Sequence, residues 1–135
     1  MYIKQYLEQH GNIKEEINAL RELVKKNPIK EAAAMALHIN KLAGKIKIHL
    51  LSEDKYLYPA LQNDTDPNAR KLAQKYQDEM GTLAAQYTDF KEKYNTQNKI
   101  HNNQQDFVSD LLFVLNLIEK RMVKEESELY RLAFN

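Results

Sequence analysis

Apolar side chains recur along this chain at spacings that alternate between three and four residues. That period keeps side chains on one face of a helix, whereas a half-buried strand would alternate at every second residue. Four such stripes follow one another. They are Ile3, Tyr6, His10, Ile13, Ile17, Leu20 and Val24; Met35, Ile39, Leu42, Ile46, His49, Glu53 and Leu57; Ala73, Tyr76, Met80, Leu83, Tyr87, Phe90 and Tyr94; and Phe107, Leu111, Val114, Ile118, Arg121, Glu125 and Leu129.

Three breaks separate the stripes. Asn27-Pro28 and Asp66-Pro67 each have the order expected when Asn or Asp caps a helix and Pro takes its first position. The polar stretch from Asn95 to Lys99 is the third break. Four long amphipathic helices joined by short loops predict an all-α fold, an up-down-up-down four-helix bundle formed by a single domain over residues 1–135.

The two halves of the chain match each other. Adding 70 to the first stripe gives the third, so that Tyr6 corresponds to Tyr76 and His10 to Met80. Adding 72 to the second stripe gives the fourth. The correspondences there include His49 with Arg121, Glu53 with Glu125, and Leu57-Tyr58 with Leu129-Tyr130. The bundle is therefore predicted to be a duplicated helical hairpin.

Polar side chains interrupt the stripes at His10, His49, Glu53, Arg121 and Glu125. Burying a charged group without a partner or a metal ion is very costly. Helices rise by about 1.5 Å per residue, so His10 and His49 lie at nearly one level on either side of the first turn. We expect one polar layer to cross the bundle, toward the end that holds the N-terminus and Pro59.

The polar layer contains a candidate metal site. His49 and Glu53 are one helical turn apart on one face, the spacing needed to bind a single cation from one helix. His10 would join them from the neighbouring helix and Glu125 from the fourth. Two imidazoles and two carboxylates suit iron, manganese or zinc better than calcium or magnesium.

The composition of the chain excludes several classes of site and binding partner. The chain has 135 residues, 29% of them charged, a formal net charge of +1 and no cysteine. The absence of cysteine excludes disulfides, thiolate zinc sites, iron–sulfur clusters and a cysteine nucleophile. The even charge balance argues against binding to nucleic acid or to a membrane surface, and no apolar run reaches the length of a membrane span. We expect a cytoplasmic protein.

These residues carry a family resemblance. His10, then His49-x-x-x-Glu53 followed by Asp54 and the run Tyr56-Leu-Tyr-Pro59, resembles the first half of the hemerythrin-like, or HHE cation-binding, domain. The resemblance covers essentially the whole chain. It implies a duplicated hairpin that holds two non-heme irons bridged by carboxylates. It also implies that His10 and His49 bind one iron, and that Glu53 and Glu125 are the bridging carboxylates.

The second half departs from the family pattern. Where the resemblance calls for histidines at the other iron, this chain has Tyr76, Met80 and Arg121. A thioether and a permanently charged guanidinium cannot replace imidazoles at such a cation. The sequence therefore predicts a degenerate di-iron site with at most one iron per chain, and it argues against oxygen carriage of the hemerythrin kind.

Arg121 offers a substitute for the missing metal ion. Its guanidinium could pair with both Glu53 and Glu125, because an arginine fork suits carboxylates and keeps its charge when buried. Two carboxylates and one arginine leave one negative charge, which a protonated histidine would cancel without any metal. A divalent ion would instead leave one positive charge and attract a hydroxide or another anion.

Three functions remain open at this point. The first is a cation-binding protein that binds or senses a metal ion or a diatomic ligand. The second is a metal-free structural or interaction bundle in which Arg121 replaces the lost metal. The third is an enzyme that uses one iron, although no catalytic residue can be assigned. The expected assembly is a monomer or a weak homodimer, the latter suggested by Phe134 if it is exposed.

Overall fold

The computed structural model describes residues 3–134, which form helices and no strand, so the all-α prediction is confirmed. Two segments labelled η are π-helical turns inside longer helical runs. The elements are α1 (Ile3–Lys25), α2 (Ala32–Ser52), η1 (Glu53–Leu57), α3 (Tyr58–Gln62), α4 (Pro67–Tyr94), α5 (Gln97–Asn102), α6 (Gln104–Lys124), η2 (Glu125–Leu129) and α7 (Tyr130–Phe134).

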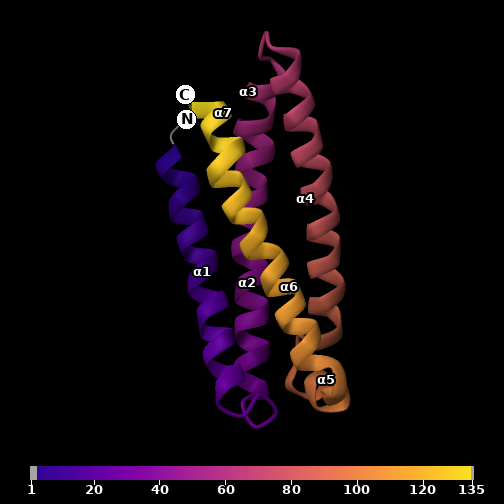
Figure 1. Cartoon of the computed structure of the whole chain (residues 1–135). Coiled ribbons are helices and arrows are strands. Elements are labelled where there is room, and N and C mark those ends of the chain that lie inside the picture. Colours follow the sequence, from indigo (N-terminus) through magenta and orange to yellow (C-terminus); the bar gives the residue numbers. More distant parts are fainter. Residues whose placement is uncertain (1–2, 135) are drawn as a thin grey trace.

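The long helices α1, α2, α4 and α6 lie alongside one another, and α3, α7 and the two chain ends gather at the same end of the molecule (Figure 1). The predicted stripes face the interior. Every residue in them is buried except Ile3 and Val24, which lie at the ends of α1. Helical periodicity therefore identified the core.

The apolar core is divided into two clusters. The larger one contains Ile13, Ile46 and Ile118, and the smaller one contains Tyr6, Leu57 and Leu129 together with neighbouring buried residues. Along α1, the α2–η1 run and the α6–η2 run, the polar stripe residues come between members of the two clusters. A buried polar layer thus crosses the interior between the two apolar clusters, as the spacing predicted.

The two π turns lie at corresponding positions of the halves. In each turn a backbone N–H bonds to the carbonyl five residues earlier, Tyr58 to Glu53 and Tyr130 to Glu125. These pairs are related by the predicted shift of 72 residues. The duplication inferred from apolar positions thus extends to a local backbone feature that the stripes do not show.

A second pair of contacts supports the same register. The Tyr6 hydroxyl donates to the Ser52 carbonyl at 3.2 Å, and the Tyr76 hydroxyl donates to the Lys124 carbonyl at the same distance. Each carbonyl immediately precedes a π turn. Corresponding tyrosines therefore make corresponding bonds in the two halves.

The helix starts agree with the sequence in one case and differ in another. Asp66 caps α4, its carboxylate accepting from the Asn68 N–H at 2.9 Å. The prediction that Pro28 is the first residue of a helix was wrong, because α2 begins at Ala32. Asn27 caps only a separate turn, and the Ala32 N–H donates to the Ile29 carbonyl, so that turn is not continuous with α2.

The third break contains an element that the stripes did not indicate. α4 ends at Tyr94, as expected, and Thr96 then caps the short helix α5. Phe134, considered above as an exposed contact for self-association, instead packs on the smaller core cluster, with its ring 6.0 Å from that of Tyr6. It therefore gives no support to a homodimer.

The buried stripe yields a stability prediction. Leu42 is completely buried in α2, whereas Leu37 on the same helix is 53% exposed. Leu42→Ala should lower the free energy of unfolding by about 2–5 kcal/mol, because it removes buried methyl groups and leaves a cavity. Leu37→Ala should change it by less than about 0.5 kcal/mol. Denaturant titration of both variants measures the difference, and equal losses would contradict the assigned core.

Candidate metal centre

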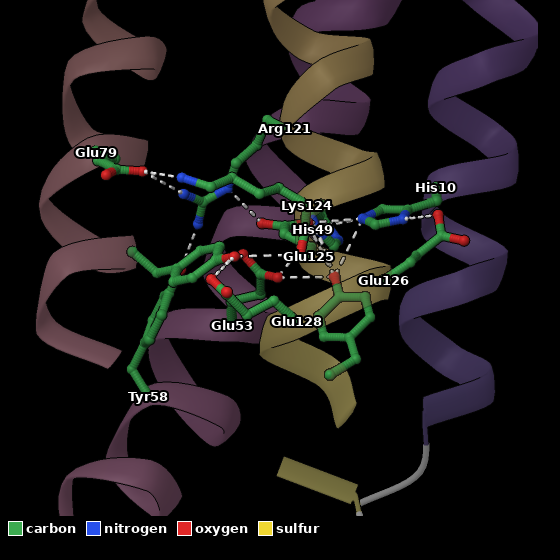
Figure 2. Close-up of polar contacts among 12 residues, drawn as sticks. His10, His49, Glu53, Tyr58, Glu79, Arg121, Lys124, Glu125, Glu126 and Glu128 are labelled. Carbon is green, nitrogen blue, oxygen red and sulfur yellow. Dashed lines mark hydrogen bonds and ion pairs between the residues drawn. The ribbon is translucent and has the colours of Figure 1, made fainter. Parts of the chain in front are cut away.

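The predicted polar side chains meet in the interior, where His10, His49, Glu53, Arg121 and Glu125 are all buried. Figure 2 shows them converging from α1, the α2–η1 run and the α6–η2 run. Helical periodicity places each of them on the inward face, and the antiparallel arrangement brings them to one level. The structure thus brings together every residue predicted to bind a metal.

The histidines and Glu125 form the closest group. The Nε2 atoms of His10 and His49 are 3.2 Å apart, and Glu125 Oε1 lies 2.7 Å from the first and 3.1 Å from the second. Bonds from a transition metal to nitrogen or oxygen are about 2.0–2.2 Å, which leaves neighbouring ligand atoms roughly 3 Å apart. The three atoms are therefore spaced as the ligands of one cation are.

Each histidine is held by a hydrogen bond on its other ring nitrogen. His10 Nδ1 lies 2.7 Å from Glu126 Oε2, and His49 Nδ1 lies 2.8 Å from Gln9 Oε1. Gln9 is oriented in turn by donating to Ser52 Oγ at 3.0 Å. With its Nδ1 proton donated outward, a neutral imidazole presents its Nε2 lone pair to the centre, the arrangement typical of metal-binding histidines.

Glu53 lies beside this group, and one of its carboxylate oxygens has no partner. Its Oε2 lies 3.2 Å from His49 Nε2. Its Oε1 is buried and, among the residues that the structure describes, has no hydrogen-bond partner. A carboxylate oxygen buried in this way is costly unless a cation or a donor reaches it. A cation bound next to Glu53 would satisfy this oxygen.

Tyr130 also lies in the site, although the sequence did not predict it as a site residue. Its hydroxyl lies within 3.2 Å of a polar atom of each of His10, His49, Glu53 and Glu125. In a regular α-helix Tyr130 would point about 140° away from Glu125, because five residues advance by 100° each. The π turn η2 brings it onto the same face. The signal available in the sequence was its match with Tyr58 in the duplicated register.

Arg121 occupies the corresponding place in the other half of the layer. Its Nε donates to Glu125 Oε2 at 2.8 Å and its Nη2 to the Tyr58 hydroxyl at 2.8 Å. The predicted pairing with both carboxylates was therefore half right. Among the residues that the structure describes, Arg121 bonds to Glu125 and not to Glu53. Glu53 Oε2 instead accepts from the Tyr130 hydroxyl, and Glu53 Oε1 has no partner.

Tyr76 and Met80 lie beside Arg121 and not among the clustered donors. The Arg121 guanidinium carbon is 4.7 Å from the centre of the Tyr76 ring, a cation–π distance. The Tyr76 hydroxyl donates to Glu128 Oε1 at 2.6 Å, away from His10 and His49. This geometry speaks against a role for Tyr76 as a phenolate ligand.

Met80 borders a small cavity next to the site. The cavity has a volume of about 20 Å³, room for one water-sized molecule. His49, Arg121 and Glu125 form its polar end. Its other walls are mainly apolar and include Ile13, Ile46, Leu83 and Ile118. A small molecule in this cavity would lie against the polar layer from the side of the larger core cluster.

Burial and neighbouring charges set the protonation of the metal-free site. Burial favours a neutral Glu125, but hydrogen bonds from His10 and His49 and the charge of Arg121 hold the pKa of its carboxyl well below the ordinary value. Burial also favours a neutral His49 and by itself would lower its pKa. The bonds of His49 to Glu125 and Glu53 nevertheless raise that pKa to about 9. Desolvation, together with the charge of Glu125, raises the pKa of Glu53. A metal ion must therefore displace the proton of His49.

The hemerythrin HHE cation binding domain matches residues 1–133. This chain belongs to that family. No curated protein and no solved structure matches it. Membership in this HHE family implies a bound cation, and the donor set of the chain fits one, because two oriented imidazole nitrogens and an ionised carboxylate converge on one point. None of the helices in residues 3–134 is long and apolar enough to cross a membrane.

The raised pKa of His49 predicts a pH dependence of stability in the metal-free HHE domain. A histidine whose pKa is higher in the folded state stabilises the fold fully below its unfolded pKa of 6.5, and this contribution disappears as the pH rises through about 9. The free energy of unfolding should fall by on the order of 3 kcal/mol over this range. Denaturant titrations in the presence of chelator measure it. An equally steep fall in His49→Gln would show that another group is responsible.

Proposed function

We propose that this chain binds one metal ion, iron or a similar transition metal such as manganese or zinc, through His10, His49, Glu53 and Glu125. The observation that carries the proposal is the convergence of two histidine Nε2 atoms and Glu125 Oε1 within about 3 Å. The Nδ1 atoms of both histidines are already held by outer acceptors, so the Nε2 lone pairs face the centre once a metal ion displaces the Nε2 protons. The unpartnered oxygen of Glu53 adds support.

The scaffold that we propose for this site is one domain over residues 1–135, an up-down-up-down four-helix bundle built from a duplicated hairpin. The paired π turns and the matching bonds of Tyr6 and Tyr76 support it. Each half then contributes one histidine or arginine and one glutamate to the layer from its second helix. The duplication explains why the layer has two halves of similar geometry.

We propose further that Arg121 takes the place of the second metal ion of the family. Its guanidinium contacts Glu125 on the oxygen opposite the one that faces His10 and His49. Glu125 therefore bridges a candidate metal position and a side-chain cation, as a bridging carboxylate would link two ions. With the second position filled by a fixed positive charge, a second ion would be repelled at close range.

The role that fits one ion is binding or sensing a metal or a small diatomic ligand, and not oxygen carriage at a di-iron centre. The cavity beside His49 and Arg121 has room for a molecule of this size. A bound ion would supply Lewis acidity or a redox couple at this position. The chain contributes the orientation of the imidazoles and the apolar walls that keep bulk water away.

The alternative is a metal-free structural or interaction bundle. The observation that favours it is the set of contacts that Glu125 makes without metal, with His10, His49 and Arg121 together. A buried network of this kind can fix helix register. Metal content separates the two functions.

The first test is the metal content of protein purified without chelator or metal-affinity resin from cells supplied with iron and manganese. Wild type should hold about one metal ion per chain, and His49→Ala should hold almost none, because it removes a central ligand. His38→Ala is the matched control, since His38 lies on the same helix but bonds to Glu16. Metal-free wild type after reconstitution would favour the structural bundle.

Replacing Arg121 tests its role as the second cation. Arg121→His removes the fixed charge and adds an imidazole beside Glu125 and Tyr58, so iron content should rise from about one toward two per chain. Arg121→Lys keeps the positive charge and should leave the content unchanged. Iron and protein assays on reconstituted samples give the ratio. An unchanged ratio in Arg121→His would rule out Arg121 as a metal substitute.

A further inference from the structure

We propose that Tyr130 is a further ligand of this site and binds ferric iron through its phenolate oxygen. The inference rests on the single-ion site proposed above and extends it, because it names the oxidation state that the site favours and the anion that completes it. Tyr130 is absent from the ligand set that the sequence predicted.

The position of the hydroxyl is that of a ligand atom. It lies 2.8 Å from Glu53 Oε2 and 3.0 Å from Glu125 Oε1. It is also 3.1 Å from His10 Nε2 and 3.2 Å from His49 Nε2. One oxygen thus contacts all four donor atoms of the proposed site at the separations expected among the ligands of a single ion.

The Tyr130 side chain is fixed in this position. It is completely buried, with its ring centre 5.4 Å from that of Tyr6 and 6.3 Å from that of Phe134. The π turn directs it inward, and the aromatic neighbours restrict its rotation. A donor held in this way loses little conformational entropy when an ion binds.

The other half of the chain provides an internal comparison. Tyr58 corresponds to Tyr130 in the duplicated register, and its hydroxyl accepts a hydrogen bond from Arg121 at 2.8 Å. In that half the positive group is a guanidinium, and the tyrosine oxygen contacts it directly. Tyr130 has the same relation to the position enclosed by His10 and His49. The duplication therefore places a tyrosine oxygen next to the cation in each half.

In the metal-free site, burial and the charges of Glu125 and Glu53 raise the pKa of Tyr130, so its proton leaves only in exchange for a bound ion. Glu53 and Glu125 carry two negative charges and Arg121 one positive charge, so a trivalent ion bound by neutral imidazoles leaves two positive charges in a buried layer. Uncompensated buried charge is costly. Loss of one proton from Tyr130 removes one of these charges without bringing an anion in from solution.

Binding of the ion exchanges the Tyr130 proton for the metal. The O–H bond of Tyr130 breaks, its proton leaves to bulk water, and the oxygen electron pair forms the bond to the ion. No electron transfer is needed when the ion is supplied as ferric iron. A phenolate is a hard anionic oxygen donor and therefore favours the harder ferric ion over ferrous iron.

The test uses the full chain loaded with ferric nitrilotriacetate and freed of excess iron. A phenolate bound to ferric iron produces a charge-transfer band in visible light, so loaded wild type should be coloured. Tyr130→Phe should lose this band while His10, His49, Glu53 and Glu125 still bind iron, with an affinity lower by at least about tenfold. Tyr58→Phe is the matched control and should keep the band, because Tyr58 contacts Arg121.

The outcomes separate this inference from the proposed function. If wild type takes up no ferric iron, the phenolate ligand is overturned, while the single-ion site is decided by the metal content of protein from cells supplied with iron and manganese. If wild type binds iron without a visible band, or if Tyr130→Phe keeps the band, the phenolate ligand is overturned and the single-ion site stands. Should Tyr130→Phe fail to fold, resonance Raman spectra of wild type and Tyr58→Phe decide, since enhanced tyrosinate ring modes in both support the ligand and their absence overturns it.

Discussion

The ion pairs of Glu125 organise the interior of this protein. One carboxylate oxygen faces His10 and His49, and the other accepts from Arg121, so a single side chain contacts polar groups from three long helical runs. Breaking a buried ion pair costs several kcal/mol, because the remaining charge is left without a partner. The layer therefore fixes how α1, α2 and α6 are positioned along one another, and it separates the two apolar clusters.

The π turns give this layer its full set of polar atoms. Each turn begins at a glutamate that lies one helical turn after His49 or Arg121, and each ends just before a tyrosine. Because the extra residue changes the direction of the following side chain, Tyr58 and Tyr130 face the layer from positions that a regular α-helix would turn away. The local backbone thus converts two tyrosines from core-packing residues into polar neighbours of the site.

The two halves of the chain differ in the source of positive charge. One half keeps two imidazoles oriented by Glu126 and Gln9. The other has Arg121, whose charge is attached to the chain and stacked on Tyr76. A guanidinium satisfies a carboxylate at every pH and metal concentration, whereas an imidazole site responds to both. This asymmetry supports the proposal of a site with one exchangeable cation.

The sequence by itself determined the helices, the buried stripes and the level of the polar layer, because helical period and rise per residue fix the face and height of each side chain. It also indicated His10, His49, Glu53 and Glu125 as one group. Only the tertiary structure decided which partner each polar atom meets. Glu53 turns toward Tyr130 and not Arg121, and the imidazoles are held by Glu126 and Gln9. Such choices depend on π turns and on packing between helices, which no spacing within a single helix encodes.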